Sequence, residues 1–483
     1  MGFYDAIRVG ASGAAVDYTV DRSLRFDNVQ IPLKRTPSSS SNQKTMTFSF
    51  WFKRAVDTNF NSFFIAYGNA SNRHGFDFVS GGKLRLWGNY NGSVAMTVQT
   101  QQVFRDFSAW YHFVCAIDTT QGTASNRVKM YVNGTQITNF ETTNYPSQNF
   151  EFGFNDQNAE TQIGSYSKLY LAEIHEIDGF AYDPSYFGET NAITGQWNPK
   201  KYVGSYGTNG FYLNFSNNSS TSALGTDSSG NSNNFTVTNL SVSDAVKDSP
   251  TNNFATYNIL AESGGTYSEG NLKVVSTADP ASSTVGFASG KFYYEVYVDA
   301  TGAQYVGVIP IDVGLNPARG GSWSSHGAIA YRGDGQQYSL KIGSSSSSIT
   351  SYGASYTAGD IIGCAVDIDN DTVTFYKNGV SQGNTTNGVS YLSPTGAKDL
   401  IYGAIVYCNG GNNIMRANFG QDSTFQGTVS AGGNTDASGI GDFKYTVPTG
   451  FKALCSANLP DPTILLPNKH FDTLLYTGNN GTQ

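Results

Sequence analysis

Residues 173–178 carry the acidic side chains that could hydrolyse a glycosidic bond. A retaining glycoside hydrolase needs two carboxyl groups about 5–5.5 Å apart, and a Glu-x-Asp-x-Glu strand would place three acids on one face. Here the alternation of a strand places Glu173 and His175 on one face and Glu176 and Asp178 on the other. Because the three acids do not line up, we interpret Glu173 and Glu176 as structural residues.

Asp367, Asp369 and Asp371 have the spacing with which a calcium loop begins. An EF-hand loop would continue through a glycine and end in a glutamate at its last position. Instead, Thr372 begins a segment of alternating polarity at once. We therefore predict a tight turn in which Asp and Asn side chains bond the backbone.

The cysteines and histidines show no pattern of a metal site or of a nucleophile. Cys115, Cys364, Cys408 and Cys455 form no Cys-x-x-Cys pair and lie in apolar segments, so we predict free, buried thiols. The sequence does not exclude a disulfide between Cys408 and either Cys364 or Cys455. No Gly-x-Ser-x-Gly or phosphate-binding motif is present, and His112, in an apolar strand, is predicted to be a satisfied core residue.

Two groups of aromatic residues are better candidates for ligand contacts. Trp87 and Tyr90 alternate with Gly and Asn, while Trp323 and His326 lie among Gly and Ser. An aromatic ring can pack on the C–H face of a sugar while Asn and Ser side chains bond its hydroxyl groups. We predict that these four residues lie in loops and contact a ligand. The alternative is that the two Trp rings cap hydrophobic cores.

Hairpins are the elements that must position these residues. Asn133-Gly134 and Asn378-Gly379 each separate two segments of alternating polarity. Asn-Gly is the strongest short-range hairpin signal, because both residues accept the positive φ of a type I′ turn. Helical periodicity is almost absent. We therefore predict an all-β protein with two tandem antiparallel β-sandwiches.

The order of strand-like and loop-like segments predicts four parts of the chain. Residues 1–22 form an N-terminal arm, residues 23–247 the first sandwich, residues 254–426 the second sandwich, and residues 442–483 an extended C-terminal segment. Prolines interrupt this last segment, which is too short to fold alone. We expect it to lie on another part of the chain.

The composition excludes two classes of partner. The net charge is −8 and only 14% of the residues are charged, whereas phosphate neutralisation needs clustered Lys and Arg, so we expect no nucleic-acid binding. No apolar stretch approaches the roughly 18 residues of a membrane span. The N-terminus also lacks the basic and apolar regions of a signal peptide. We therefore expect no membrane insertion and release by cell lysis.

Several motifs stand in an order that is found in known families. Those in the first half are Phe48, Trp51, Trp110, His112, Asn133, Gly134, and Ile174 to Gly179; those in the second half are Gly290 to Glu295, Val306, Gly307, Gly359, Asp360, Gly363, and Phe375 to Gly379. With these motifs, residues from about 23 to 215 resemble the laminin-G/concanavalin-A-like sandwich, and residues from about 285 to 420 resemble the SPRY domain. Together with the segment from Val447 to Pro460, the combination is similar to structural proteins of tailed phages.

This resemblance implies a non-enzymatic virion protein, of the tail-fibre or host-recognition type, that binds a cell-surface glycan or protein. It also implies other virion proteins as partners and the virion as the location. Relatives of the first sandwich often bind calcium at its rim, so the resemblance allows calcium there and implies no other cofactor. One alternative is a capsid decoration or adaptor protein. The other is a glycan depolymerase, because the concanavalin-A-like fold also includes hydrolases.

The N-terminal arm offers apolar anchors on a permissive backbone. Phe3, Tyr4 and Ile7 precede Gly10 and Gly13. Such a segment can add to a neighbour's sheet edge, where main-chain hydrogen bonds supply affinity and aromatic rings supply register. We predict that the arm attaches the chain to the particle; a frayed terminus is the alternative. By analogy with fibres, we expect a homotrimer.

Overall fold

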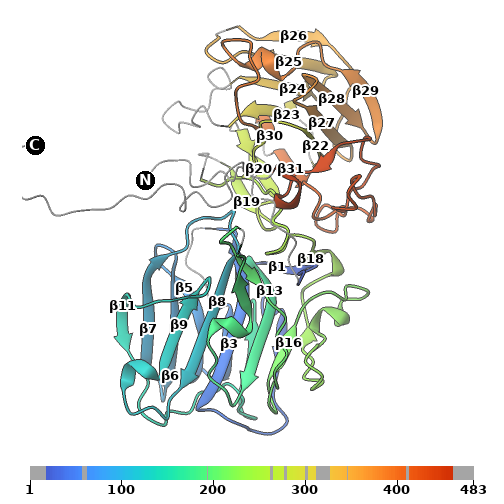
Figure 1. Ribbon diagram of the computed structural model, residues 1–483. Coiled ribbons are helices and arrows are strands. Elements are labelled where there is room, and N and C mark those ends of the chain that lie inside the picture. The colour runs from blue at the N-terminus through green and yellow to red at the C-terminus, as the bar shows by residue number, and fades with distance from the viewer. Residues whose placement is uncertain are drawn as a thin grey trace, which may run out of the picture.

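The computed structural model contains two β-sandwiches, which Figure 1 shows one below the other. Within the described residues, all helices are short 3-10 turns, and none is long and apolar enough to cross a membrane. The predicted all-β fold class is confirmed. The described residues are 18–56, 62–192, 194–260, 265–276, 280–299, 303–311, 327–344, 346–409 and 413–460. The 3-10 turns are η2 (Ala124–Asn126), η3 (Pro184–Tyr186), η4 (Ser222–Gly225), η5 (Val242–Asp244), η8 (Val389–Leu392) and η9 (Ser456–Asn458).

The first sandwich consists of two eight-stranded antiparallel sheets, which we call sheet I and sheet II. Sheet I has the order β10-β9-β8-β3-β13-β1-β18, with β16 also paired to β13, and sheet II has the order β11-β7-β6-β5-β4-β12-β2-β17. The strands of sheet I are β1 (Ser23–Asp27), β3 (Thr45–Arg54), β8 (Tyr111–Asp118), β9 (Val128–Val132), β10 (Thr135–Gln136), β13 (Lys168–Asp178), β16 (Phe211–Leu213) and β18 (Ala245–Val246). Those of sheet II are β2 (Leu33–Arg35), β4 (Phe64–Asn69), β5 (Asn72–Val79), β6 (Lys83–Tyr90), β7 (Ser93–Val103), β11 (Phe140–Asn144), β12 (Glu160–Ile163) and β17 (Thr236–Val237). A small ribbon of β14 (Gly188–Thr190) and β15 (Trp197–Pro199) follows β13.

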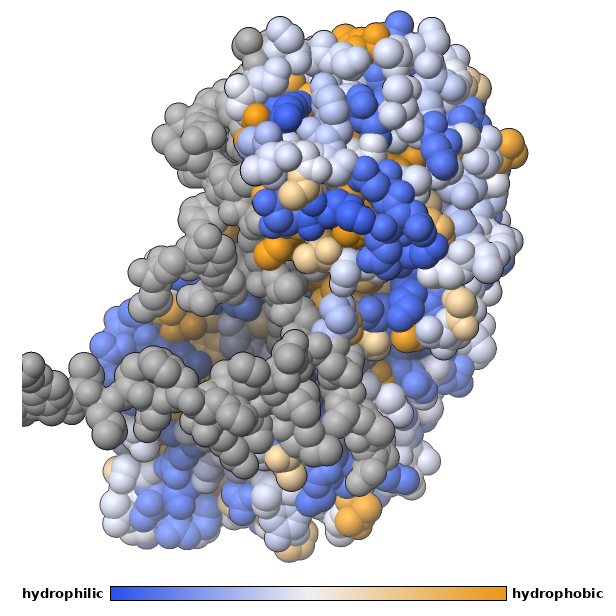
Figure 2. Space-filling model, turned by 45° about the horizontal axis from the view of Figure 1, so that its top comes forward, coloured by the Kyte–Doolittle hydropathy of each residue, from blue (hydrophilic) through white to orange (hydrophobic). Residues whose placement is uncertain are grey.

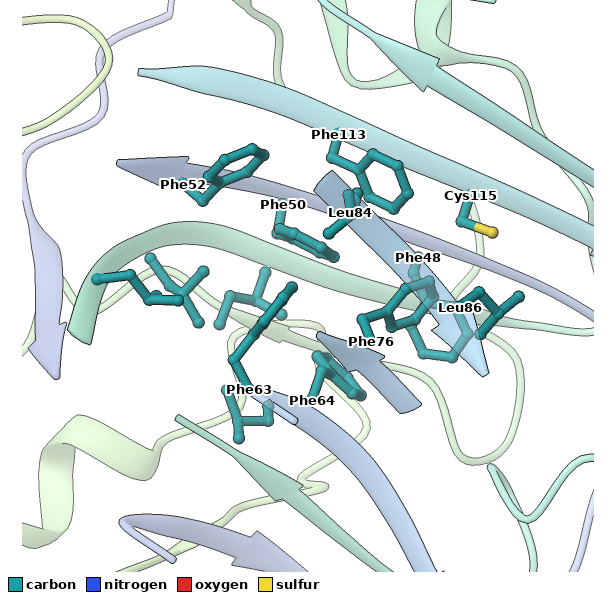
Figure 3. Packing of buried hydrophobic residues seen from close by; sticks show 14 of the residues in the cluster. Phe48, Phe50, Phe52, Phe63, Phe64, Phe76, Leu84, Leu86, Phe113 and Cys115 are labelled. Carbon is teal, nitrogen blue, oxygen red and sulfur yellow. The ribbon is translucent and has the colours of Figure 1, made fainter. Parts of the chain in front are cut away.

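Phenylalanine rings fill the space between sheets I and II. Phe48, Phe50 and Phe52 alternate along β3 and are fully buried, and Figure 3 shows them in one cluster with Phe63 and Phe64. Many rings meet edge to face: the centroids of Phe48 and Phe64 are 5.2 Å apart at 76°. Each buried aromatic side chain removes roughly 150–250 Å² from water, and such pairs add about 0.5–1.5 kcal/mol. This core fixes which residues of each strand face outward.

The second sandwich also has two layers, which we call sheet III and sheet IV, around a largely aliphatic core. Sheet III has the order β19-β20-β31-β22-β27-β28-β29, with β32 parallel to β22, and sheet IV has the order β21-β30-β23-β24-β25-β26. The strands of sheet III are β19 (Thr266–Ser268), β20 (Lys273–Ser276), β22 (Lys291–Val298), β27 (Ile361–Asp367), β28 (Thr372–Lys377), β29 (Val380–Asn384), β31 (Asn413–Asn418) and β32 (Lys452–Ala453). Those of sheet IV are β21 (Pro280–Ser282), β23 (Ala303–Pro310), β24 (Ala328–Arg332), β25 (Gln336–Leu340), β26 (Ser348–Ser351) and β30 (Tyr402–Asn409).

The predicted hairpins form as the sequence indicated. Asn133 and Gly134 join β9 to β10 with φ of 46° and 79°, and Asn378 and Gly379 join β28 to β29 with φ of 50° and 79°. These left-handed values are the ones that a type I′ turn requires.

The predicted turn after β27 also forms. Asp367 ends β27 and accepts a 3.0 Å hydrogen bond from the backbone N–H of Asn370, after which Thr372 begins β28. The other two acids of this turn also bond the backbone, since Asp369 accepts from the N–H of Gly290 and Asp371 from that of Ser390. All three are therefore engaged in the turn, as the sequence predicted.

The thiols of Cys115, Cys364 and Cys455 are free and buried, which excludes both of the disulfides left open above. Cys115 lies in the core of the first sandwich and Cys364 in that of the second. Burial raises the pKa of both thiols above the ordinary value of a cysteine. They therefore pack as small apolar side chains.

A buried polar joint connects the two sandwiches on the outer face of sheet I. The Lys53 ammonium donates to Asp248 Oδ2 at 2.7 Å and to Asn253 Oδ1 at 2.9 Å, while Trp110 Nε1 donates to the second oxygen of Asp248. Nearby, Arg25 pairs with Asp422 of the second sandwich at 3.3 Å. Since Lys53 and Arg25 are each only 1% exposed, these ion pairs are shielded from water.

Residues 442–460 of the predicted C-terminal segment lie on the outer face of sheet III, and residues 461–483 are outside the described residues. Residues 452–453 pair with β22, and Phe443 and Val447 pack against Tyr293. The buried Glu295 holds the segment, because its carboxylate accepts hydrogen bonds from the backbone N–H groups of Lys444 at 2.8 Å and Tyr445 at 2.9 Å. This outer face is therefore closed by the protein's own chain.

Candidate functional site

The outer face of sheet II forms a groove of about 560 Å³. Its floor comes from β4, β5, β6, β7 and β12. In β6, Leu84 and Leu86 point into the core, so Arg85 and Trp87 point outward into the groove. The groove therefore exists because the alternation of these strands supplies polar and aromatic residues to one face.

One row of neighbours crosses the sheet in the order Thr97, Trp87, Gly75, Ile65 and Gln162. At the glycine in the middle of this row, β4 approaches β5 closely. A Cβ atom at Gly75 would lie only 2.5 Å from a backbone oxygen of β4, so this position requires glycine. Gly75 adds no side chain to this row, so Trp87 and Ile65 supply the groove surface on either side of it.

The next row places Arg73 between Asn89 and Tyr67. The Arg73 guanidinium lies 5.5 Å from the ring centroid of Trp87, which is a cation–π distance. Trp87 Nε1 in turn donates a 2.9 Å hydrogen bond to Ser62 Oγ. The ring is thus held by two contacts and supports the cation beside it.

Of the two arginines of the groove, one is paired with an acidic side chain and the other is not. Arg85 binds Asp77 through two hydrogen bonds, from Nε to Oδ1 at 2.9 Å and from Nη2 to Oδ2 at 2.5 Å. Burial raises the pKa of Asp77, while Arg85 opposes that rise. The guanidinium of Arg73 makes no hydrogen bond and no ion pair with the described residues, and its Nε is buried without a hydrogen-bond partner. It is therefore the free cation of the groove.

Tyr166, which lines the groove, and Ile31, which contacts the lining residue Ser165, have backbone conformations that are costly for their residue types. Tyr166 has a φ of 51° and Ile31 a φ of 44°, both in the left-handed region that aromatic and β-branched residues rarely adopt. Ser165 links them, because its hydroxyl accepts a 3.2 Å hydrogen bond from the N–H of Ile31. Such strain costs about 1–3 kcal/mol per residue and is found most often at functional sites.

The structure corrects the predicted setting of Trp87 and Tyr90. Both lie on β6 rather than in a loop, because the turn is formed by Asn91 and Gly92, whose φ values are 49° and 78°. Trp87 faces the groove and does not cap the core. Tyr90, at the end of the strand, is 57% exposed and lies beyond the residues that line the groove.

The remaining predicted contact residues cannot be placed. Trp323 and His326 lie outside the described residues, as do the predicted anchors Phe3, Tyr4 and Ile7. Their roles stay predictions.

Of the residues that line the groove, the sequence predicted only Trp87; Tyr67, Arg73 and Tyr166 are among those that it did not predict. The alternation of β5 is a local signal that would have placed Arg73 and Asp77 on one face. No local signal shows that Tyr67 stands next to Arg73, because this depends on the register of two strands.

The acids of β13 are held in structural contacts, in agreement with their interpretation as structural residues. The alternation of residues 173–178 is as predicted, since Ile174 faces the core and Glu173 and His175 face outward. Glu173 accepts hydrogen bonds from Tyr212 and Tyr18 at 2.7 and 2.8 Å. Its φ of 49° marks a β-bulge that the sequence did not reveal.

The two acids on the inner face of β13, Glu176 and Asp178, are also buried. Asp178 accepts hydrogen bonds from the backbone N–H groups of Thr208 and Asn209. Burial raises the pKa of Glu176 to about 8, and the nearby Asp178 adds to this rise. Neither acid lines the groove.

A buried Ser–His pair lies on the outer face of sheet I, but its proton is on the wrong side for nucleophile activation. Ser49 Oγ lies 2.9 Å from His112 Nε2, and Trp197 Nε1 donates to His112 Nδ1 at 2.9 Å. Since an indole N–H can only donate, Nδ1 is an acceptor and the proton of the neutral ring is on Nε2. Burial lowers the pKa of His112 to about 3, so the ring stays neutral and donates to Ser49. As predicted, His112 is buried and both of its ring nitrogens are hydrogen-bonded. It lies on the outer face of sheet I, however, and not in the core that sheets I and II enclose.

Within the described ranges, no three His, Cys, Asp or Glu side chains are grouped as a metal site would require. Calcium at the rim of the first sandwich therefore stays a prediction from the resemblance.

Comparison with known families agrees with both sandwiches. Residues 27–165 match the concanavalin A-like lectin/glucanases superfamily, and residues 291–422 match the SPRY domain. The chain carries a concanavalin A-like domain followed by a SPRY domain. The groove on sheet II thus belongs to the concanavalin A-like domain, while the C-terminal segment closes one face of the SPRY domain.

Two curated proteins are similar in sequence to part of this chain. The E3 ubiquitin-protein ligase RKP of Arabidopsis thaliana is 31% identical over 105 residues, which are 22% of this chain and 8% of that protein. Ran-binding protein 9 of Xenopus tropicalis is 31% identical over 135 residues, or 28% of this chain and 22% of that protein. The matched regions are thus a small part of these relatives.

Solved structures include the SPRY domain of human HERC1 and a heptameric SAP-like pentraxin from Limulus polyphemus. The HERC1 domain is 15% identical with a TM-score of 0.24, covering 33% of this chain and 96% of that chain. The pentraxin is 16% identical with a TM-score of 0.26, covering 35% of this chain and 80% of that chain.

Proposed function

We propose that this protein is a non-enzymatic virion component whose concanavalin A-like domain binds a cell-surface glycan in the groove on sheet II. The groove is the observation that carries the proposal. It combines the rings of Tyr67, Trp87 and Tyr166 with the amides of Asn89 and Gln162. Rings pack on the C–H faces of sugars, and amides bond their hydroxyl groups.

A glycan suits this site better than an extended peptide. The backbone polar groups of β4, β5, β6, β7 and β12 are used in the sheet, so a ligand on this face is recognised by side chains. Extended peptides instead gain affinity by adding to an exposed sheet edge. In addition, Glu173, Asp178 and the Ser49–His112 pair make structural hydrogen bonds, which supports binding without hydrolysis.

The virion part of the proposal rests on the similarity of the domain combination and of the segment from Val447 to Pro460 to structural proteins of tailed phages. The SPRY relatives named above share only a single domain with this chain and give no support for a particle. Mass spectrometry of purified particles is expected to detect the protein in multiple copies, and its absence would reject this part. Antibody labelling of the tail supports host recognition, whereas labelling across the head would support the decoration alternative.

Glycan binding is tested with the full chain on an array of cell-surface polysaccharides. The Trp87→Ala variant is expected to lose at least about fivefold in affinity, because the contact of an aromatic ring with a sugar is worth roughly 1 kcal/mol or more. Tyr186→Ala is the matched control, since Tyr186 is an exposed aromatic residue outside the groove. Equal binding by Trp87→Ala and the wild type would reject the groove as the site. Release of reducing ends from a bound polysaccharide would support the depolymerase alternative.

A further inference from the structure

We infer that the groove on sheet II selects sugars that carry an anionic substituent, a carboxylate or a sulfate ester, and that Arg73 binds this group. The inference rests on the proposed glycan-binding function and names the class of glycan.

Arg73 differs from every other arginine that the structure describes. Each of the others has a hydrogen-bond acceptor or an acidic partner, whereas Arg73 has neither. The other described arginines are Arg22, Arg25, Arg35, Arg54, Arg85, Arg105, Arg127, Arg332 and Arg416. The Nε–H of Arg73 is buried without an acceptor, which is unfavourable, and the other four N–H donors of the guanidinium have no acceptor among the described residues.

This free cation occurs in a protein that has an excess of acids to pair it with. The chain has 37 Asp and Glu residues against 29 Lys and Arg residues. The nearby carboxylates are engaged elsewhere: Asp77 with Arg85, and Glu160 with Lys34 at 3.8 Å and with the amide of Gln162 at 2.8 Å. Among the described residues, the groove thus keeps one positive charge for which no acidic group is supplied.

The position of Arg73 suits an anionic substituent on a sugar ring. Its guanidinium rests over Trp87, which holds it in place, and its neighbours across the sheet are Asn89 and Tyr67. A guanidinium binds a carboxylate or sulfate through two parallel hydrogen bonds, which an ammonium group cannot copy. A sugar that lies on the tyrosine rings would therefore direct its acidic group to Arg73 and its hydroxyl groups to the amides.

The test uses pairs of polymers that differ only in charge: alginate against carboxyl-reduced alginate, and dextran sulfate against dextran. We expect the full chain to bind at least one charged polymer at least about tenfold more tightly than its neutral counterpart. Arg73→Gln should remove this preference, and Arg73→Lys should restore only part of it. A preference for alginate identifies the carboxylate, and a preference for dextran sulfate identifies the sulfate.

The control variant is Lys129→Gln, which removes one positive charge from the outer face of sheet I. It is expected to keep the preference for the charged polymer, because the effect is local to the groove. Two results would overturn the inference: equal binding of charged and neutral polymers by the wild type, or an unchanged preference in Arg73→Gln. In either case the proposed glycan-binding function would still stand if the Trp87→Ala variant loses binding. Absence of binding to all four polymers and to the array would overturn both.

Discussion

The two sheets of the first sandwich have very different surroundings on their outer faces. Over β1, β3 and β13, the outer face of sheet I is covered by the chain itself, and its polar groups there, such as Ser49, Lys53 and Glu173, are buried and hydrogen-bonded. The outer face of sheet II is open and keeps a cation, Arg73, without a partner. In the same sandwich, one sheet thus packs against other parts of the chain, while the other has an open outer face, where we propose that the ligand binds.

Sheet III of the SPRY domain follows the pattern of sheet I. Its outer face is closed by residues 442–460, and Glu295 accepts hydrogen bonds there from two backbone N–H groups, from Tyr293 and from Asn418. A charge on a covered face is stable only if its partners are fully supplied. Charged residues on covered faces should therefore matter for stability, and those on the open face for binding.

The largest effect is expected at the joint on sheet I. Lys53→Met leaves the buried Asp248 without its cation, and breaking such a pair costs about 3–5 kcal/mol. Chemical denaturation measures the loss. The control is Lys34→Met, whose ion pair with Glu160 lies on sheet II with both side chains partly exposed, and which should cost at most about 1 kcal/mol. Similar losses in the two variants would mean that the covered and open faces do not differ.

The second effect concerns the closed face of sheet III. Glu295→Ala leaves the N–H groups of Lys444 and Tyr445 and the amide of Asn418 without an acceptor, which should cost about 3 kcal/mol at roughly 1 kcal/mol or more per unsatisfied group. Limited proteolysis should then cleave within residues 442–460 faster than in the wild type. Unchanged stability and cleavage would show that the segment is held by its apolar contacts alone.

The third effect is a dependence of stability on pH. Burial raises the pKa of Glu295 from 4.5 to about 7, although its hydrogen-bond donors oppose the rise. Between these values the folded chain binds the proton more strongly than the unfolded chain, so the free energy of unfolding falls as the pH rises from 4.5 through 7. At about 1.36 kcal/mol per pH unit, the loss is at most about 3 kcal/mol.

The pH dependence of the free energy of unfolding is compared between the wild type and Glu295→Gln. Unfolding at pH 5 and pH 8 should show a larger loss for the wild type, because the variant has no carboxyl to titrate at this position. Glu176, whose pKa is also raised, contributes equally to both proteins and cancels. Parallel pH profiles would contradict the assignment to Glu295.

The smallest effect on stability is expected on the open face. Trp87→Ala removes a partly exposed ring and should cost about 1 kcal/mol, whereas Phe50→Ala in the core should cost about 3–5 kcal/mol. Thermal unfolding compares the two variants. A loss at Trp87 as large as that at Phe50 would mean that the groove is part of the folding core, and the comparison of faces would have to be abandoned.

The sequence by itself determined the fold class and the hairpins. Asn133-Gly134 and Asn378-Gly379 specify their turns locally, because few residue pairs accept positive φ twice in succession. The inward direction of Phe48, Phe50 and Phe52 also follows from alternation alone. These features depend on residues that are close in the chain, and local chemistry is sufficient to predict them.

Only the tertiary structure decided which face is open and which is covered. Arg73, Trp87 and Tyr67 lie on three neighbouring strands, and their contacts depend on a register that no single segment specifies. Likewise, nothing local shows that Lys53 would meet Asp248, or Glu295 the backbone of Lys444. The physical reason is that a free or a satisfied charge is a property of its surroundings, and these surroundings are assembled from distant parts of the chain.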